Sequence, residues 1–194
     1  MSAIPCNAQM LGFEVLDAQS NTCTKTSAPL YAALSFRISF KVREPVVAPA
    51  LFVAVDFIAD VASEQPPVPL LPLRPVAPAD LVNSFTKTSE SLNAAVLSSS
   101  SPATNEGSID TLSLLLSPHA TYALTFSVAD LSKLRAIPLK HLLQVSVMRV
   151  RLATAVAGAN TEENTVATWK AVWQVRRDPQ NNQELVRTLL SPLS

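Results

Sequence analysis

Few side chains in this sequence are of the types that carry catalytic or metal chemistry. The two histidines, His119 and His141, both fall in predicted loops or turns, and the two cysteines, Cys6 and Cys23, have no metal-ligand spacing. No serine or cysteine stands in the context of a nucleophile elbow or a triad, and no glycine-rich phosphate loop is present. We therefore expect a protein that is not an enzyme and that holds no metal and no cofactor.

The residues that favour a binding function lie in one alternating stretch, residues 143–152. Side chains on a strand point alternately to its two faces, so Val145, Val147, Arg149 and Arg151 share one side. The two arginines mark that side as solvent-facing, which places both valines on an outer surface. Exposed apolar side chains beside fixed cations favour a binding surface, although an exposed valine pair is also compatible with ordinary surface.

The two arginines do not by themselves predict nucleic-acid binding, because no exposed aromatic residues are interleaved with them. The chain carries 15 basic and 15 acidic residues, and these are unevenly distributed. Residues 1–130 hold 6 basic and 11 acidic side chains, whereas residues 131–194 hold 9 basic and 4 acidic ones. The sequence therefore predicts a polarised molecule and no direct contact with nucleic acid.

Length and composition favour one globular β-rich domain, which we place at residues 8–192 of the 194. Hydrophobic residues make up 48% and charged residues 15%, and 15 prolines against 3 glycines indicate stiff connections. The beginning of the chain lacks the features of a signal peptide, and the most apolar run is interrupted by Asp56 and Asp60. We expect a soluble, intracellular protein with reduced cysteines and no membrane contact.

Alternating apolar and polar residues predict the strands that must position these side chains. Residues 36–42 alternate most cleanly, and residues 165–176 place Trp169 and Trp173 on the inward face. Residues 184–190 fit either a short helix or an edge strand. The other predicted strands are 11–17, 51–59, 111–116, 122–128 and 143–152. This pattern, with almost no helix, predicts an all-β protein, an immunoglobulin-like antiparallel β-sandwich.

Residues 61–108 have a different composition. Six prolines fall between Pro66 and Pro78, and a tract rich in serine, threonine and asparagine follows them. Each proline removes a backbone donor from a sheet, and the polar tract offers little to bury. We expect a disordered or loosely ordered insertion, with a brief helical turn in residues 79–84 or 91–97.

The order of these segments resembles the anti-silencing function family, chaperones of the H3–H4 histone dimer. The resemblance covers most of the chain except the predicted insertion and the ends. FRISF, at residues 36–40, is similar to the family's Phe-x-Ile-x-Phe strand, and LSLLLSP stands where the family has a strand that ends in Gly-Pro. After YALTF, the pair Ile137-Pro138, the turn and the valine-rich strand match the family without a gap. AVWQVRR resembles the family's next strand.

The resemblance implies a histone chaperone for nucleosome assembly and disassembly in the nucleus, with the H3–H4 dimer and other chromatin-assembly proteins as partners. The family binds a histone helix on a concave face through a central-strand valine, which falls on Val147. Its neighbouring arginine falls on Lys170, its tyrosine on Gln174, and Arg149 stands where the family has a leucine. The implied histone-binding set is Val145, Val147, Arg149, Lys170, Gln174, Phe57 and Leu115.

The sequence departs from the family in several respects, Arg149 among them, and a relative that shares the fold without binding histones is one alternative. The family is acidic whereas this chain is neutral, and Ala48-Pro49 stand where the family's acidic pair docks co-chaperones. A second alternative is an immunoglobulin-like scaffold module that binds a non-histone protein. Another is a sandwich that holds an apolar ligand between its sheets, which the bulky inward residues Trp169 and Trp173 argue against.

Overall fold

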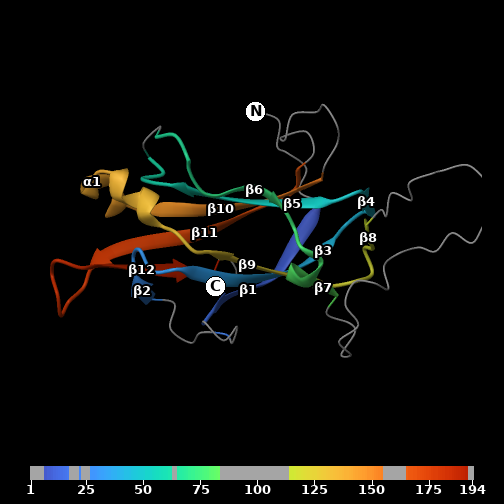
Figure 1. The fold of residues 1–194 in the computed structure, drawn as a ribbon, viewed down its shortest axis with the longest axis horizontal. Helices are drawn as coiled ribbons and strands as arrows, with labels where there is room; N and C mark the ends of the chain where they lie inside the picture. The colour runs from blue at the N-terminus through green and yellow to red at the C-terminus, as the bar shows by residue number, and fades with distance from the viewer. Residues whose placement is uncertain are drawn as a thin grey trace, which may run out of the picture.

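The computed structural model describes residues 7–17, 22, 27–62, 65–83, 114–154 and 165–191. These residues form strands joined by turns and three short helices (Figure 1). The strands are β1 (Ala8–Leu16), β2 (Ser27–Pro29), β3 (Leu34–Val42), β4 (Val46–Ala48), β5 (Leu51–Ile58), β6 (Val68–Pro75), β7 (Leu81–Asn83), β8 (Leu114–Leu116), β9 (Tyr122–Val128), β10 (Ser146–Thr154), β11 (Thr165–Arg177) and β12 (Leu185–Leu190). The helices are the 3-10 helices η1 (Pro78–Asp80) and η3 (Ser132–Ala136) and the α-helix α1 (Leu139–Leu142).

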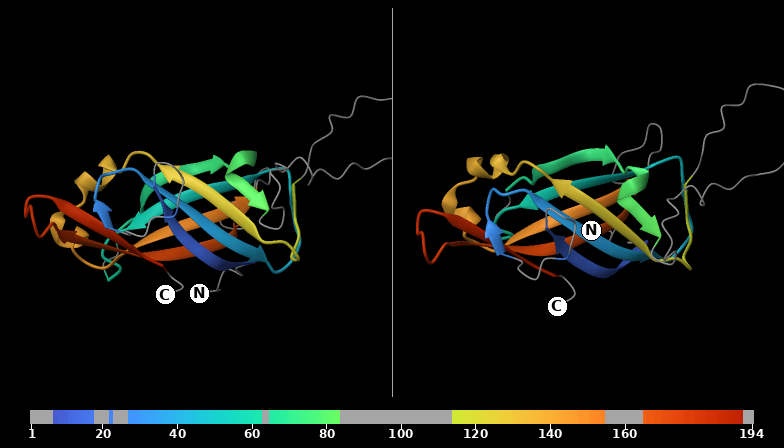
Figure 2. Two further views of the ribbon diagram at one scale, coloured as in Figure 1. Left: turned by 90° about the horizontal axis from the view of Figure 1, so that it is seen from below. Right: turned by 60° about the horizontal axis from the view of Figure 1, so that its bottom comes forward.

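Two antiparallel sheets pack face to face (Figure 2). Within the described residues, one sheet has four strands in the order β1-β3-β9-β7, and the other has six in the order β2-β12-β11-β10-β5-β6. Strands β4 and β8 pair separately, at the end of the molecule opposite α1 (Figure 1). The predicted all-β antiparallel sandwich is confirmed.

The alternation read from β3 and β11 sets the core between the sheets. Phe36, Phe40 and Trp173 are fully buried, and Trp169 is nearly so. The rings of Phe40 and Trp169, which come from opposite sheets, have centroids 5.2 Å apart. Large aromatic side chains contribute much of the apolar area that a core removes from water. The inward face predicted for both strands is therefore correct.

Strand β10 lies in the middle of the six-stranded sheet, between β5 and β11. Pro138 is the N-cap residue that precedes α1, and the short helix leads the chain into β10. Along the strand Met148 and Val150 are buried, whereas Arg149 and Arg151 are half-buried on the other side. The predicted alternation is confirmed for residues 146–152, where one face packs on the core and the other meets solvent, but Leu143, Gln144 and Val145 precede the strand and are all exposed.

The predicted insertion is wrong for residues 65–83. Residues 68–75 form β6, which pairs with β5, and residues 81–83 form β7, which pairs with β9. Prolines are tolerated here because β6 is an edge strand with register shifts, where missing backbone donors leave few partners unpaired. The helical turn predicted in 79–84 is present only as η1, and residues 84–108 lie outside the described residues.

Residues 184–190, which the sequence left open between a short helix and an edge strand, contain strand β12. This strand lies between β11 and β2. Its Arg187 is only 2% exposed. The guanidinium donates to the carbonyl oxygens of Pro29, Leu30, Ala32 and Ala33 at 2.6–2.9 Å. Burial lowers the pKa of Arg187 to about 10. This side chain fixes the turn that leads from β2 into β3.

Candidate functional site

The outer face of the six-stranded sheet carries a row of apolar side chains that crosses four strands. The antiparallel register places Leu190, Val172, Val147 and Ile58 side by side on β12, β11, β10 and β5. Leu190 is 44% exposed and Val172 is 38% exposed, whereas Val147 and Ile58 are half-buried. Neighbouring strands lie about 4.8 Å apart, so this apolar row is about 14 Å long. A contiguous row of apolar side chains on an outer sheet face is a candidate contact surface.

Val145 extends the apolar row toward α1. It lies two residues before Val147 and is 59% exposed. Its carbonyl oxygen accepts a hydrogen bond from the backbone N–H of Val61 at 3.1 Å, and the side chain of Val61 is also exposed. The exposure predicted for Val145 is therefore confirmed, and Val61 adds a further apolar side chain beside it.

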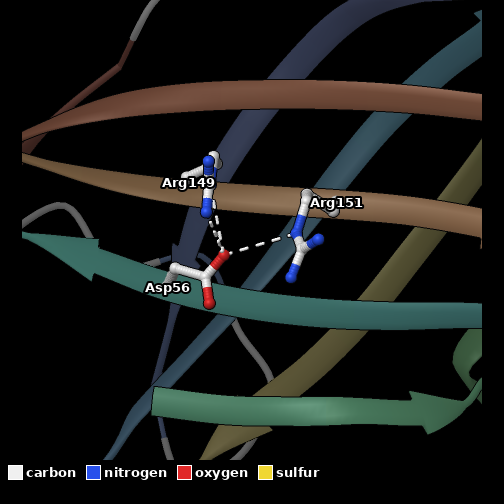
Figure 3. Close-up of polar contacts among 3 residues, drawn as sticks. All are labelled: Asp56, Arg149 and Arg151. Carbon is white, nitrogen blue, oxygen red and sulfur yellow. Dashed lines mark hydrogen bonds and ion pairs between the residues drawn. The ribbon is translucent and has the colours of Figure 1, made fainter. Parts of the chain in front are cut away.

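A charged cluster of Asp56, Arg149 and Arg151 lies on β5 and β10 (Figure 3), two residues along these strands from the apolar row. Arg149 on β10 faces Asp56 on β5, and its Nε and Nη2 donate to Asp56 Oδ2 at 3.1 and 2.9 Å. Arg151 Nε lies 3.3 Å from the same oxygen, within ion-pair distance but without hydrogen-bond geometry. Asp56 is 6% exposed, so the pairing with Arg149 compensates for the loss of water around its carboxylate.

This cluster leaves the outer face positively charged. Asp56 is shared by two guanidinium groups, and exposed Lys170 on β11 is the register partner of Arg149. Like charges on neighbouring strands repel each other unless a counter-charge lies between them. The strip formed by Lys170, Arg149, Asp56 and Arg151, which we call the cationic row, therefore carries two more positive than negative charges.

The structure brings together five of the seven residues predicted for histone binding. Val145, Val147, Arg149 and Lys170 lie on the outer face of the six-stranded sheet. Gln174 is exposed on β11, two residues beyond Val172 and opposite Thr188 of β12. Four of these residues come from the adjacent strands β10 and β11 and Val145 immediately precedes β10, so one ligand can contact all of them.

Phe57 does not line this face, and its predicted role there is wrong. It is fully buried, and its ring meets Trp173 edge to face at 5.2 Å. Residues 52–58 alternate, so Asp56 and Ile58 point outward and Phe57 points into the core. The outward apolar residue of β5 at this level is Ile58.

Leu115 also lies away from the site. It belongs to β8, where it is half-buried and pairs with Val47 of β4. This pair of strands is at the opposite end of the molecule from α1, and Val145 follows α1 directly (Figure 1). The resemblance aligned LSLLLSP with a strand of the family, but here that segment does not reach the outer face of the six-stranded sheet.

Sequence reasoning did not assign five residues to the site, namely Val61, Val172, Leu190, Asp56 and Ile58. Leu190 was hidden because residues 184–190 fit helix and strand equally well. Asp56 was noted only as an interruption of an apolar run, although a lone carboxylate in such a run is itself a sign of a buried ion pair. Ile58 was overlooked because both faces of β5 are apolar in sequence, so alternation could not orient them.

Comparisons with known proteins do not assign the chain to a family. No family model matches it, and a search of curated proteins finds no significant match. In the part of the chain that the structure describes, no helix is long and apolar enough to cross a membrane. Among those same residues, no three histidine, cysteine, aspartate or glutamate side chains gather in a metal-binding arrangement.

Proposed function

We propose that this chain is a histone chaperone, a binding protein rather than an enzyme, which holds the H3–H4 dimer on the outer face of the six-stranded sheet. The observation that carries the proposal is the apolar row across β12, β11, β10 and β5. Its central member, Val147, is also the residue that the family resemblance assigns to the histone anchor. Alternation, register and resemblance thus point to one surface.

A helix fits the dimensions of the apolar row. Successive turns of an α-helix are 5.4 Å apart, close to the spacing of about 4.8 Å between strands. Apolar side chains at positions i, i+4 and i+7 of a helix laid across the strands therefore meet Leu190 or Val172, then Val147, then Ile58. Burying one valine in this way stabilises a complex by roughly 1.5 kcal/mol.

The binding face is preorganised by its own ion pair. Arg149 is held by two hydrogen bonds to Asp56, and both residues sit on strands in the middle of a paired sheet. A side chain that is already fixed loses little conformational entropy when a partner docks. The central part of the surface therefore does not need to rearrange to receive a helix.

A second candidate function is supported by the charge of this face. The cationic row borders the apolar row, and a positive surface attracts partners that carry carboxylates and repels basic ones. A scaffold module that binds an acidic amphipathic helix of a non-histone protein fits this charge better than a uniformly basic partner does. The two candidate functions use the same surface and differ in the charge of the partner that binds there.

Binding to purified histone dimers tests the proposal. The full chain is titrated against H3–H4 and, as a matched control, against the dimer of the other two core histones, at physiological and at raised salt. Preference for H3–H4 that persists at raised salt supports the chaperone, because apolar contacts are not screened. Equal binding of both dimers, or no binding, contradicts it.

The second candidate is tested with one amphipathic helical peptide in two versions. Its apolar face is flanked by glutamates in one version and by lysines in the other. Selective binding of the glutamate version, together with no binding of H3–H4, favours the scaffold module.

A further inference from the structure

Strand β6 has a proline pattern that the proposed function does not use. Prolines 66, 69, 72, 75 and 78 recur at every third residue. Three residues per turn is the period of the polyproline II helix, whereas a flat β-strand repeats every two. The sequence of this edge therefore matches a polyproline ridge better than an ordinary strand.

The pairing of β6 with β5 shows the same departure from a flat strand. Between Val68 and Pro75 the chain takes seven residue steps, while its partner takes five, from Phe57 to Phe52. Two register shifts absorb the difference. An edge strand that loses the two-residue period in this way is free to display its side chains with a period of three.

Burial follows the three-residue period. Prolines 69, 72 and 75 are all exposed, and Val68, Leu71 and Arg74 are all half-buried. On the third face, Leu70 is buried against the core and Val76 is half-buried, although Leu73 is exposed. The proline face of the ridge is thus turned wholly toward solvent, whereas Val68 and Leu71 pack partly against the core, over a length of about 19 Å from residue 68 to residue 74.

The cation at the end of the ridge lacks a strong partner. Arg74 stands two residues after Pro72, and its Nη2 lies 3.6 Å from Asp80 Oδ2. Its Nε is buried and has no hydrogen-bond partner. An exposed ion pair at this distance contributes little, so a better-placed carboxylate can replace Asp80.

The edge is unsuited to pairing with another strand. Proline has no backbone N–H, so positions 69, 72 and 75 cannot donate to a neighbouring strand. At the other end of the ridge, Lys133 Nζ already donates to the carbonyl oxygen of Pro69 at 3.0 Å. A second copy of this chain therefore does not extend the sheet at β6.

We propose that β6 is a docking ridge for an SH3-type domain, a partner with a groove of aromatic side chains and a carboxylate at one end. Pro69 and Pro72, with the exposed parts of Val68 and Leu71, contact the aromatic groove, and Arg74 pairs with the carboxylate. A polyproline segment already fixed in a fold loses little entropy on binding. This inference does not rest on histone binding, because no residue of β6 belongs to the apolar row, although β6 pairs directly with β5.

The test uses the full chain against a set of purified SH3 domains, including those that select Pro-x-x-Pro-x-Arg peptides, with one WW domain for comparison. Displacement of a fluorescent Pro-x-x-Pro-x-Arg peptide measures the affinity. We expect wild-type protein to displace it, and Pro72→Ala or Arg74→Ala to weaken binding about tenfold or more. Arg74→Lys retains part of the affinity, because a lysine supplies the charge without the paired donors.

Pro67→Ala is the matched control, since Pro67 is exposed but lies off the three-residue period. It should bind as wild type does, and all variants should keep the wild-type thermal transition, which shows that β6 is still folded. The proposal is overturned if wild-type protein displaces no peptide at millimolar concentration. Equal loss in Pro67→Ala and Pro72→Ala, or binding to the WW domain alone, also overturns it.

Discussion

Replacing Val147 by arginine separates a surface role from a core role. Val147 lies on the outer face between Val172 and Ile58, where it is half-buried by these neighbours. An arginine there can lay its methylene stem over the apolar row and keep its charge in water. We therefore expect Val147→Arg to lower the free energy of unfolding by only about 0.5–1 kcal/mol.

The same change removes the centre of the proposed contact. Loss of one buried valine costs a complex roughly 1.5 kcal/mol, and the added charge must be desolvated or left beside the cationic row. Together these effects amount to about 2–3 kcal/mol, which corresponds to roughly 30-fold to 150-fold weaker binding of the H3–H4 dimer. Fluorescence titration with the dimer and denaturant unfolding are measured on the same preparation.

Val82→Arg is the control, because Val82 is an exposed valine on β7 in the other sheet. It should lose neither stability nor affinity beyond about 0.5 kcal/mol. Three results refute the reasoning. These are a Val147→Arg protein that does not fold, one that binds histones as wild type does, and a Val82→Arg protein that loses affinity equally.

Other side chains give further expectations. Lys170→Glu should weaken histone-dimer binding several-fold in the same titration while Lys170→Arg preserves it, and equal loss in both would assign the position to packing. Asp56→Asn leaves Arg149 without a counter-charge and should lower the free energy of unfolding by about 1–2 kcal/mol, measured in denaturant. Arg187→Met leaves carbonyl oxygens unpaired at the β2–β3 turn and should cost about 2–4 kcal/mol by the same measurement. Hydrogen bonds from the Ser132 backbone N–H and hydroxyl lower the pKa of Asp130 below 3.8, so its stabilisation is present above that pH and lost as the pH falls through the lower folded value. Thermal unfolding of wild type and Asp130→Asn should accordingly converge in strong acid.

The strands with one buried and one solvated face could be predicted from the sequence. In β3, in β9 and in β11 from Ala167 onward, buried and less buried residues alternate because one side packs on the core, so the sequence pattern fixes which side chains point inward. The same logic oriented β10, where two arginines marked the outer side. From these strands the sandwich and the exposure of Val145 followed without knowledge of any partner strand.

The errors arose where local pattern does not determine the structure. Strand β5 is apolar on both sides, so its orientation depends on the pairing of Asp56 with Arg149, which lies 93 residues away in sequence. The proline-rich sequence of β6 is typical of disordered segments, and only its position at a sheet edge explains why it can form a strand. The apolar row exists only through the register of four strands, and register is a long-range property.

The pairing at Asp56 also explains why an apolar row and a cationic row occur side by side. Burying the Asp56 carboxylate without a cation would destabilise the fold. Arg149 supplies the cation and donates two hydrogen bonds to one oxygen of that carboxylate. Arg151 and Lys170 each add a positive charge, and the single negative charge of Asp56 is already balanced by Arg149. Because Arg149 is held by the fold rather than by a partner, much of the positive charge persists when the face is empty.

A partner that buries its apolar side chains on Val147 is therefore favoured if it carries a carboxylate about 7 Å further along the strand direction, which is the distance between outward residues of β10. On a histone dimer, this requirement selects a helix with acidic residues next to its apolar face and rejects the basic surfaces that surround it.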